Sequence, residues 1–224
     1  MQTSPAHQVR NYLSDTLTFF RSHLTSLFLI VLPYALLSEL ALHFYIQKQE
    51  AQQQLIAVFF VEMILFPILQ TVIVLYMAAA VSGQRRSPLQ CYSFSVQFWP
   101  RMLLLSVFTM VTVISGLSLF IVPGIYLLIR FSLSEMFCII ERQSLIASIS
   151  SSFSATVPVT WVIVIGLGIL FPAITATTLV ISKMAHNIDL PLASFAATAV
   201  QGVLRSLYII YLFRVFSAIR QPAC

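Results

Sequence analysis

The sequence predicts an all-α membrane protein with six transmembrane helices. Five long segments are apolar and nearly free of charge, and a sixth is apolar apart from Arg130 and Glu135. A helix needs about 20 apolar residues to cross a hydrocarbon core of roughly 30 Å, and it satisfies its own backbone polar groups where water is absent. Only 8% of the residues are charged, against about 25% in a typical soluble domain. The predicted spans are residues 24–45, 55–81, 102–122, 124–140, 160–181 and 190–213.

No loop between these spans is long enough to form a separate soluble domain, which typically needs about 50 residues. We therefore predict one polytopic membrane domain over residues 1–224. The segment 1–11 is polar and lacks the apolar core of a signal peptide, so the first span is expected to be retained. The three cysteines (Cys91, Cys138, Cys224) are odd in number and widely spaced, so neither a disulfide framework nor a metal site is expected.

The basic residues predict the topology. With six spans and the N-terminus inside, only Lys48 and Lys183 fall in outside loops. An excess of arginine and lysine marks cytoplasmic segments, so both termini are expected in the cytoplasm. A nucleic-acid-binding protein would gather its arginines on one solvated face. Here they flank apolar helices, and no nucleic-acid partner is expected. The inside arginines are Arg10, Arg21, Arg85, Arg86, Arg101, Arg142, Arg214 and Arg220.

Amphipathic helices are predicted before spans 1, 3 and 5, over residues 5–20, 88–99 and 143–156. The first two begin with Ser-Pro, at positions 4 and 87, which is typical of an N-cap followed by proline at the first helical position. Each carries an apolar stripe opposite a polar face, as in helices that lie in the headgroup plane. Pro100 and Pro158 are expected to break the second and third of these helices from their spans.

The chain is thus predicted to contain three units, each an interfacial helix followed by a transmembrane hairpin. The units are residues 5–82, 87–140 and 142–214, and the hairpin turns are expected outside, at 47–54, 122–124 and 182–189. Internal repeats are common in membrane folds. The alternative is that short loops alone give any multi-span protein this regular appearance. Trp99 and Trp161 are expected near the cytoplasmic interface, where aromatic rings favour the headgroup level.

Five ionisable residues within the spans form a candidate intramembrane polar cluster. Such residues are costly in hydrocarbon and are functional candidates. Counting at 1.5 Å per residue from the outer ends of the spans places Glu39, Glu62 and Arg130 about 10 Å below the outer surface. Arg130 is therefore expected to pair with Glu39 or Glu62. Glu135 and Arg205 lie deeper, near the middle of the membrane, and are a second candidate pair. One interpretation is that these charges neutralise one another and lock the spans together. The other is an ion or proton pathway, or a polar site for a lipid headgroup.

Sequence patterns of enzymes are missing from the chain. It has no GxSxG, HExxH, P-loop or glycine-rich dinucleotide turn, and its four histidines are scattered. We therefore expect no enzyme, no catalytic residue, no cofactor and no metal. On the sixth span, a row of small and polar residues at i+4 spacing is expected to be its packing face and to point Arg205 inward. That row is Ala193, Ala197, Gln201 and Arg205.

Four short sequence words occur in order along the chain: Val-Ser-Gly-Gln-Arg at 81–85, Val-Pro-Gly-Ile at 122–125, Ala-Ser-Ile-Ser-Ser at 147–151 and Ile-Tyr-Leu-Phe-Arg at 210–214. In these words and in hydropathy, nearly the whole chain resembles the YciC-like family of uncharacterised bacterial inner-membrane proteins. The resemblance implies an inner-membrane location, several spans and no known activity.

The leading hypothesis is a non-enzymatic inner-membrane protein that supports envelope or lipid homeostasis. Its expected partners are membrane lipids and other inner-membrane proteins. The alternative hypothesis is a small transporter or channel that uses the intramembrane charges.

Overall fold

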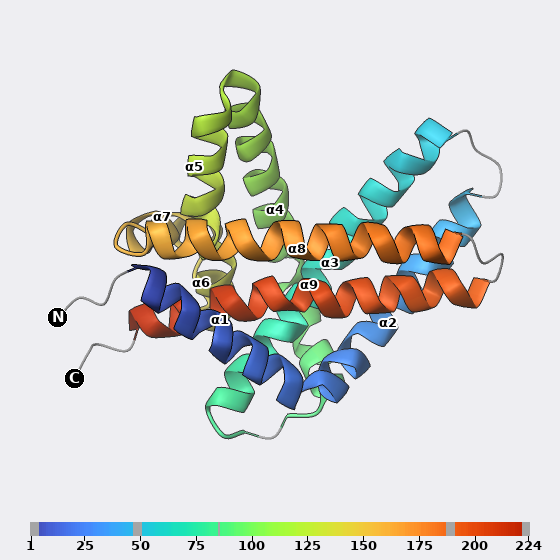
Figure 1. Ribbon diagram of the computed structural model, residues 1–224, viewed down its shortest axis with the longest axis horizontal. Coiled ribbons are helices and arrows are strands. Elements are labelled where there is room, and N and C mark those ends of the chain that lie inside the picture. The colour runs from blue at the N-terminus through green and yellow to red at the C-terminus, as the bar shows by residue number, and fades with distance from the viewer. Residues whose placement is uncertain (1–4, 47–50, 85, 187–190, 221–224) are drawn as a thin grey trace.

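The computed structural model describes residues 5–46, 51–84, 86–186 and 191–220, and this part of the chain contains helices and no strand. Six helical segments are long and apolar enough to cross a membrane. The prediction of an all-α fold with six spans is confirmed (Figure 1). The helices are α1 (Pro5–Ser22), α2 (Leu24–Ile46), α3 (Ala51–Val81), α4 (Pro88–Leu119), α5 (Ile121–Phe131), α6 (Ser134–Ile140), α7 (Leu145–Ala155), α8 (Thr160–His186) and α9 (Pro191–Arg220).

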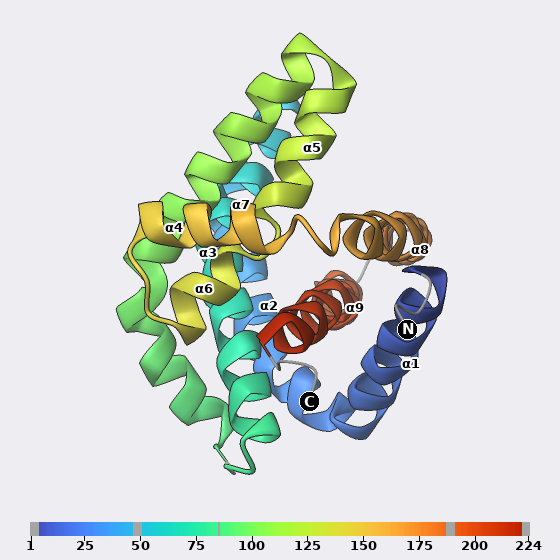
Figure 2. The same cartoon turned by 90° about the vertical axis from the view of Figure 1, so that its left-hand side faces the viewer.

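The helices pack around a common core, from which the α4–α5 hairpin and the α8–α9 pair extend in different directions (Figure 1). α8 and α9 lie side by side, and α2 and α3 pack on the other side of α9. The hairpin of α4 and α5 projects away from α8 and α9 in both views (Figures 1 and 2). The two ends of the chain lie at the same end of the molecule (Figure 1). This arrangement agrees with an even number of spans, while the cytoplasmic location of that end stays a prediction.

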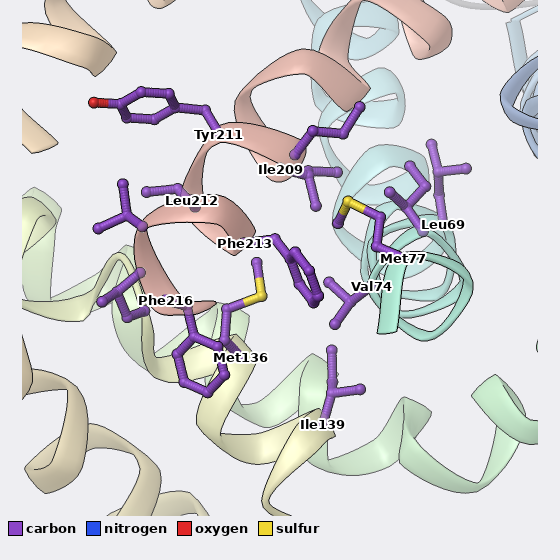
Figure 3. Packing of buried hydrophobic residues seen from close by; sticks show 14 of the residues in the cluster. Leu69, Val74, Met77, Met136, Ile139, Ile209, Tyr211, Leu212, Phe213 and Phe216 are labelled. Carbon is purple, nitrogen blue, oxygen red and sulfur yellow. The ribbon is translucent and has the colours of Figure 1, made fainter. Parts of the chain in front are cut away.

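The centre of the core is the C-terminal half of α9. Ile209 and Phe213 face α3, where Leu69 and Met77 are buried, and Tyr211 points the opposite way, toward α8 (Figure 3). The Tyr211 hydroxyl donates to the Val162 carbonyl oxygen at 2.7 Å. Its ring lies against Gly166, where an added Cβ would stand 2.1 Å from the ring. α8 and α9 therefore approach closely because position 166 has no side chain.

Local signals set the end of α3 and the start of α4. Gly83 has φ +71, and the amides of Gly83 and Gln84 donate to the carbonyls of Ala80 and Ala79, which is a Schellman C-cap. Ser87 then caps α4 together with Gln90 in a capping box, with Pro88 in the first turn. The helix start predicted at Ser87-Pro88 is confirmed.

The prediction of a separate interfacial helix over residues 88–99 is wrong. α4 continues through Pro100 as one helix to Leu119. Cross-helix bonds hold it before the proline: the Trp99 indole Nε1 donates to the Ile64 carbonyl oxygen at 3.0 Å, in the span of α3, and the Tyr92 hydroxyl donates to the Ile30 carbonyl oxygen in α2. Neighbouring helices can compensate for a proline within a transmembrane helix. The three-unit division therefore fails in its second unit.

The fourth span also differs from the prediction. It is not one straight helix, because α5 ends at Phe131 and α6 begins at Ser134. The turn before it lies at Phe120, which has extended backbone, so 122–124 belongs to the first turn of α5. Gly116 and Gly124 let α4 and α5 touch, since a Cβ at position 116 would stand 3.0 Å from the Gly124 Cα. The four exposed residues at the tip are large and apolar: Leu119, Phe120, Ile121 and Val122.

α1 and α7 are separate helices before spans 1 and 5, close to the bounds predicted for them. α1 packs on α8 and α9 and buries Val9 and Thr16. Arg214 on α9 forms an ion pair with Asp15 on α1 at 2.9 Å. That both helices lie in the headgroup plane stays a prediction. Some sequence predictions fall outside the described residues, namely those on Ser4, 47–50 with Lys48, Arg85, 187–190 and Cys224.

Candidate functional site

Polar side chains run along one face of α9. They recur every three or four residues, which is the spacing of a single helix face. From the first to the last is about 21 Å at 1.5 Å per residue, so the row extends through most of a bilayer core of roughly 30 Å. We call this row the α9 polar stripe. Its members are Ser194, Thr198, Gln201, Arg205 and Tyr208.

At the start of α9 the stripe binds a carboxylate from α2. The Thr198 hydroxyl donates to Glu39 Oε1 at 2.6 Å, and the Ser194 hydroxyl donates to Glu39 Oε2 at 3.2 Å. One turn further, the Gln201 amide donates to the Ser182 hydroxyl on α8 at 2.9 Å. Hydroxyl and amide bonds of this kind join helices in membranes. Glu39 is therefore part of the contact between α2 and α9.

The middle of the stripe holds an ion pair. Arg205 Nη1 lies 2.5 Å from Glu62 Oε2 on α3, and the Tyr34 hydroxyl on α2 donates to Glu62 Oε1 at 2.8 Å. The side chains of Arg205 and Glu62 are 33% and 31% exposed. Three helices thus meet at one neutralised pair, and both carboxylate oxygens of Glu62 have a donor.

A third intramembrane carboxylate is bonded by α3. Glu135 on α6 accepts a hydrogen bond from the Gln70 amide on α3. The candidate pair of Glu135 with Arg205 is therefore wrong. Arg205 pairs with Glu62 instead, and Glu135 accepts a hydrogen bond from the neutral amide of Gln70.

Arg130 lies away from the stripe, and its predicted pairing with Glu39 or Glu62 is wrong. Its guanidinium lies over the rings of Tyr126 (4.8 Å) and Phe153 (5.4 Å). Its Nη1 donates to Thr156 Oγ1 at 3.3 Å, whereas its Nε is buried with no hydrogen-bond partner. Within the described residues, the ion pairs all involve other arginines. We call Arg130, Tyr126, Phe153 and Thr156 the Arg130 site.

The depth estimate did not predict the neighbours of Arg130, because α5 packs mainly on α4, α7 and α8. α5 ends next to Arg130, and the Ser152 hydroxyl on α7 donates to the Arg130 carbonyl oxygen at 2.6 Å. This bond fixes the end of α5 to α7. Figure 2 shows α7 lying across the base of the α4–α5 hairpin. Arg130 is thus at the junction of α5 and α7, and α2 and α3 supply no partner for it.

Several polar partners were not foreseen from the sequence: Tyr34, Gln70, Thr156 and Thr198. The predicted row on α9 contained part of the signal, because Thr198 shares the face of Gln201 and Arg205. Uncharged polar residues are common in spans. Only the position of the facing helix therefore shows which of them bond an intramembrane charge.

The sequence profile of the Uncharacterised protein family (UPF0259) matches residues 46–218. The chain belongs to this family. The resemblance to the YciC-like family is thereby confirmed. A "UPF0259 membrane protein" of Serratia proteamaculans (strain 568) is 32% identical over 140 residues, which cover 62% of this chain and 55% of that protein. A "UPF0259 membrane protein" of Yersinia pestis (strain Pestoides F) is 27% identical over 143 residues, 64% and 56% of the two chains. The chain spans about half the length of these curated relatives. No solved structure matches.

The polar groups of this UPF0259 chain are of two chemical kinds. The carboxylates at 39, 62 and 135 each accept hydrogen bonds from a neighbouring helix. The Arg130 cation, in contrast, has aromatic and hydroxyl neighbours and, among the described residues, no carboxylate partner. No group of three or more metal-ligating side chains occurs within the described ranges. The arrangement can join helices through the first kind and bind an anion through the second.

Proposed function

We propose that this UPF0259 chain is a non-enzymatic bacterial inner-membrane protein that supports envelope or lipid homeostasis by binding membrane lipids. Its termini lie in the cytoplasm, and other inner-membrane proteins are its second class of partner. The observation that carries the proposal is the division of the polar groups. The intramembrane carboxylates are used in contacts between helices, while Arg130, which also lies in a span, has no carboxylate partner among the described residues.

The surface of the molecule supports the same proposal. Large apolar side chains are exposed along the projecting hairpin and along α8, including Leu104, Val111, Ile114, Phe171 and Leu179. Exposed apolar patches of this extent are rare on soluble monomers. Hydrocarbon chains are the surroundings that such faces require.

The experiment that tests the proposal is extraction with native lipids followed by mass spectrometry. The protein is solubilised in a mild detergent, and the phospholipids that co-purify are counted per chain. A second inner-membrane protein of similar size is the control for lipid carried over by the detergent. Retention of one or more phospholipids above the control is expected. Retention equal to the control would contradict lipid binding as the function.

A second candidate function is a small transporter or channel. The observation that favours it is the continuity of the α9 polar stripe, which bonds Glu39 and Glu62 in sequence along one helix. Chains of carboxylates in spans occur in proton relays. The test is reconstitution into vesicles with an entrapped pH dye. Proton flux above that of protein-free vesicles, abolished by Glu62→Gln, would favour transport, whereas no flux is expected if the stripe only joins helices.

A further inference from the structure

We propose that the Arg130 site binds the phosphate group of a phospholipid, with Arg130 as the anion-binding residue and Tyr126 and Phe153 as the walls that orient it. This inference rests on the proposed function, because it names where and by what chemistry the lipid is held. The shared chemistry is a phosphate anion, and the experiment below separates a lipid headgroup from free phosphate.

The first argument is the unmatched charge. A guanidinium carries five N–H donors and no acceptor. At Arg130 one donor reaches Thr156, and the buried Nε reaches no acceptor. The arginines at 205, 214 and 220 each have a carboxylate partner. A charge without a partner is unfavourable in an apolar environment, so a mobile anion is the expected counter-ion.

The second argument is orientation. The rings of Tyr126 and Phe153 are 6.0 Å apart in a T-shaped arrangement, and the guanidinium lies over both. Contact with aromatic faces covers the face of a guanidinium and leaves its edge for hydrogen bonds. That edge is the part of arginine that matches two oxygens of a phosphate. The Thr156 hydroxyl fixes one side of the fork, because it accepts from Nη1 while donating to the Ser152 carbonyl oxygen at 2.9 Å.

The third argument is what surrounds the cation. Exposed apolar surface flanks the cation: the rings of Tyr126 and Phe153 contact it and are themselves partly exposed, and the exposed Val157 follows Thr156. Polar serines such as Ser150 and Ser154 are exposed on α7 itself. A phospholipid combines one phosphate with long apolar chains, so it uses both the cation and the apolar surface. Free phosphate has no apolar chain that could contact the apolar surface.

The location agrees with a headgroup. α7 is the helix predicted to lie in the headgroup plane, and Arg130 is bonded to it through its carbonyl oxygen and its side chain. Arg142 before α7 and Trp161 after it, which is strongly exposed, are residue types that favour the membrane interface. Arginine, moreover, can reach the interface from a partly buried position by extending its stem.

The test compares lipid and phosphate binding in Arg130→Gln, Arg130→Lys and wild type. Thermal unfolding is followed in detergent while a phosphatidylglycerol or inorganic phosphate is added, and retained phospholipid is counted by native mass spectrometry. Phosphatidylglycerol is expected to raise the Tm of wild type, and equal concentrations of inorganic phosphate are not. Arg130→Gln is expected to weaken lipid binding about tenfold, the size of one lost charge-assisted contact. Arg130→Lys is expected to fall between, because it keeps the charge without the planar fork.

The matched control is Arg214→Gln, which removes an arginine from a surface ion pair outside the site. It is expected to bind lipid as wild type does. If Arg130→Gln does not fold, the intermediate affinity of Arg130→Lys carries the test. Equal lipid retention by wild type and Arg130→Gln would overturn the site while leaving lipid binding intact. No retention by wild type would overturn the proposed function as well. A Tm rise as large with inorganic phosphate as with phosphatidylglycerol would overturn the lipid assignment.

Discussion

At the scale of single residues, the intramembrane charges follow one rule: each carboxylate is bonded by a helix that is distant in sequence. Glu62 is the clearest case, since α9 supplies Arg205 and α2 supplies Tyr34 to its two oxygens. A charge that has lost its partner in such a place is left partly desolvated. The energetic importance of the pair therefore shows only when one member is removed.

Arg205→Leu is predicted to destabilise the protein, because it leaves Glu62 charged beside apolar side chains. Breaking a fully buried pair costs about 3–5 kcal/mol. The cost here is expected to be smaller, since each side chain is about one third exposed. Thermal unfolding in detergent measures it. The double change Arg205→Leu with Glu62→Leu is expected to recover part of the loss, and Arg205→Leu melting like wild type would show that the pair is not stabilising.

Sequence reasoning paired the intramembrane charges wrongly. All five candidate residues lie in spans, and four of them join helices through side chains, namely Glu39, Glu62, Glu135 and Arg205. Partner choice depends on where each helix bends and which face it turns. Arg130 illustrates the difficulty, because α5 packs mainly on α4, α7 and α8, and this packing leaves Arg130 away from the two carboxylates that were predicted at its depth.

At the scale of helices, contacts depend on the absence of side chains. Gly166 and Gly168 lie two residues apart on α8, yet only the first faces α9 closely. A Cβ at 166 would stand 2.1 Å from the ring of Tyr211, whereas a Cβ at 168 would meet nothing within 4 Å. The two positions therefore form a matched pair for measuring the packing of α8 on α9.

Gly166→Ala is predicted to lower the Tm, because the new methyl group overlaps the Tyr211 ring and must push the helices apart. Overpacking of this kind costs about 1–3 kcal/mol. Gly168→Ala is expected to leave the Tm unchanged or to raise it slightly. Combining Gly166→Ala with Tyr211→Leu is expected to restore part of the stability by making room. Equal effects at 166 and 168 would contradict the close approach of α8 to α9 at Gly166.

A proline in the middle of α4 gives a second prediction at this scale. If α4 is continuous, Pro100→Ala supplies an N–H that can bond the Val96 carbonyl oxygen. The change is then expected to leave the Tm equal or higher. The gain should stay below the roughly 3 kcal/mol that proline costs in an exposed helix interior, since neighbouring helices already support α4. A clear loss of stability would instead indicate that the chain needs a break at residue 100, as the sequence pattern suggested.

At the scale of the whole molecule, the ion pairs near the chain ends are grouped. Asp15 binds Arg214, and Glu141 binds Arg220. These contacts tie α1 and the loop after α6 to the last two turns of α9. They gather at the end of the molecule where both termini lie (Figure 1). The number of spans could be predicted because it depends only on the length and polarity of segments, whereas their tilts depend on contacts that one sequence does not encode locally.

The topology prediction belongs to this scale. A reporter fused after Gln84 is expected on the cytoplasmic side, because it follows two spans and adjoins Arg86. A reporter fused after Asp189 follows five spans and is expected on the opposite side, and a C-terminal fusion is expected to match Gln84. Alkaline phosphatase and fluorescent protein fusions, active on opposite sides of the inner membrane, measure all three positions. Positive charges orient the chain, so replacing Arg85, Arg86 and Arg101 with glutamine should raise the share of chains that insert inverted. The same side for Gln84 and Asp189 would contradict six spans, whereas opposite sides with the signs exchanged would keep the fold and reverse only its orientation.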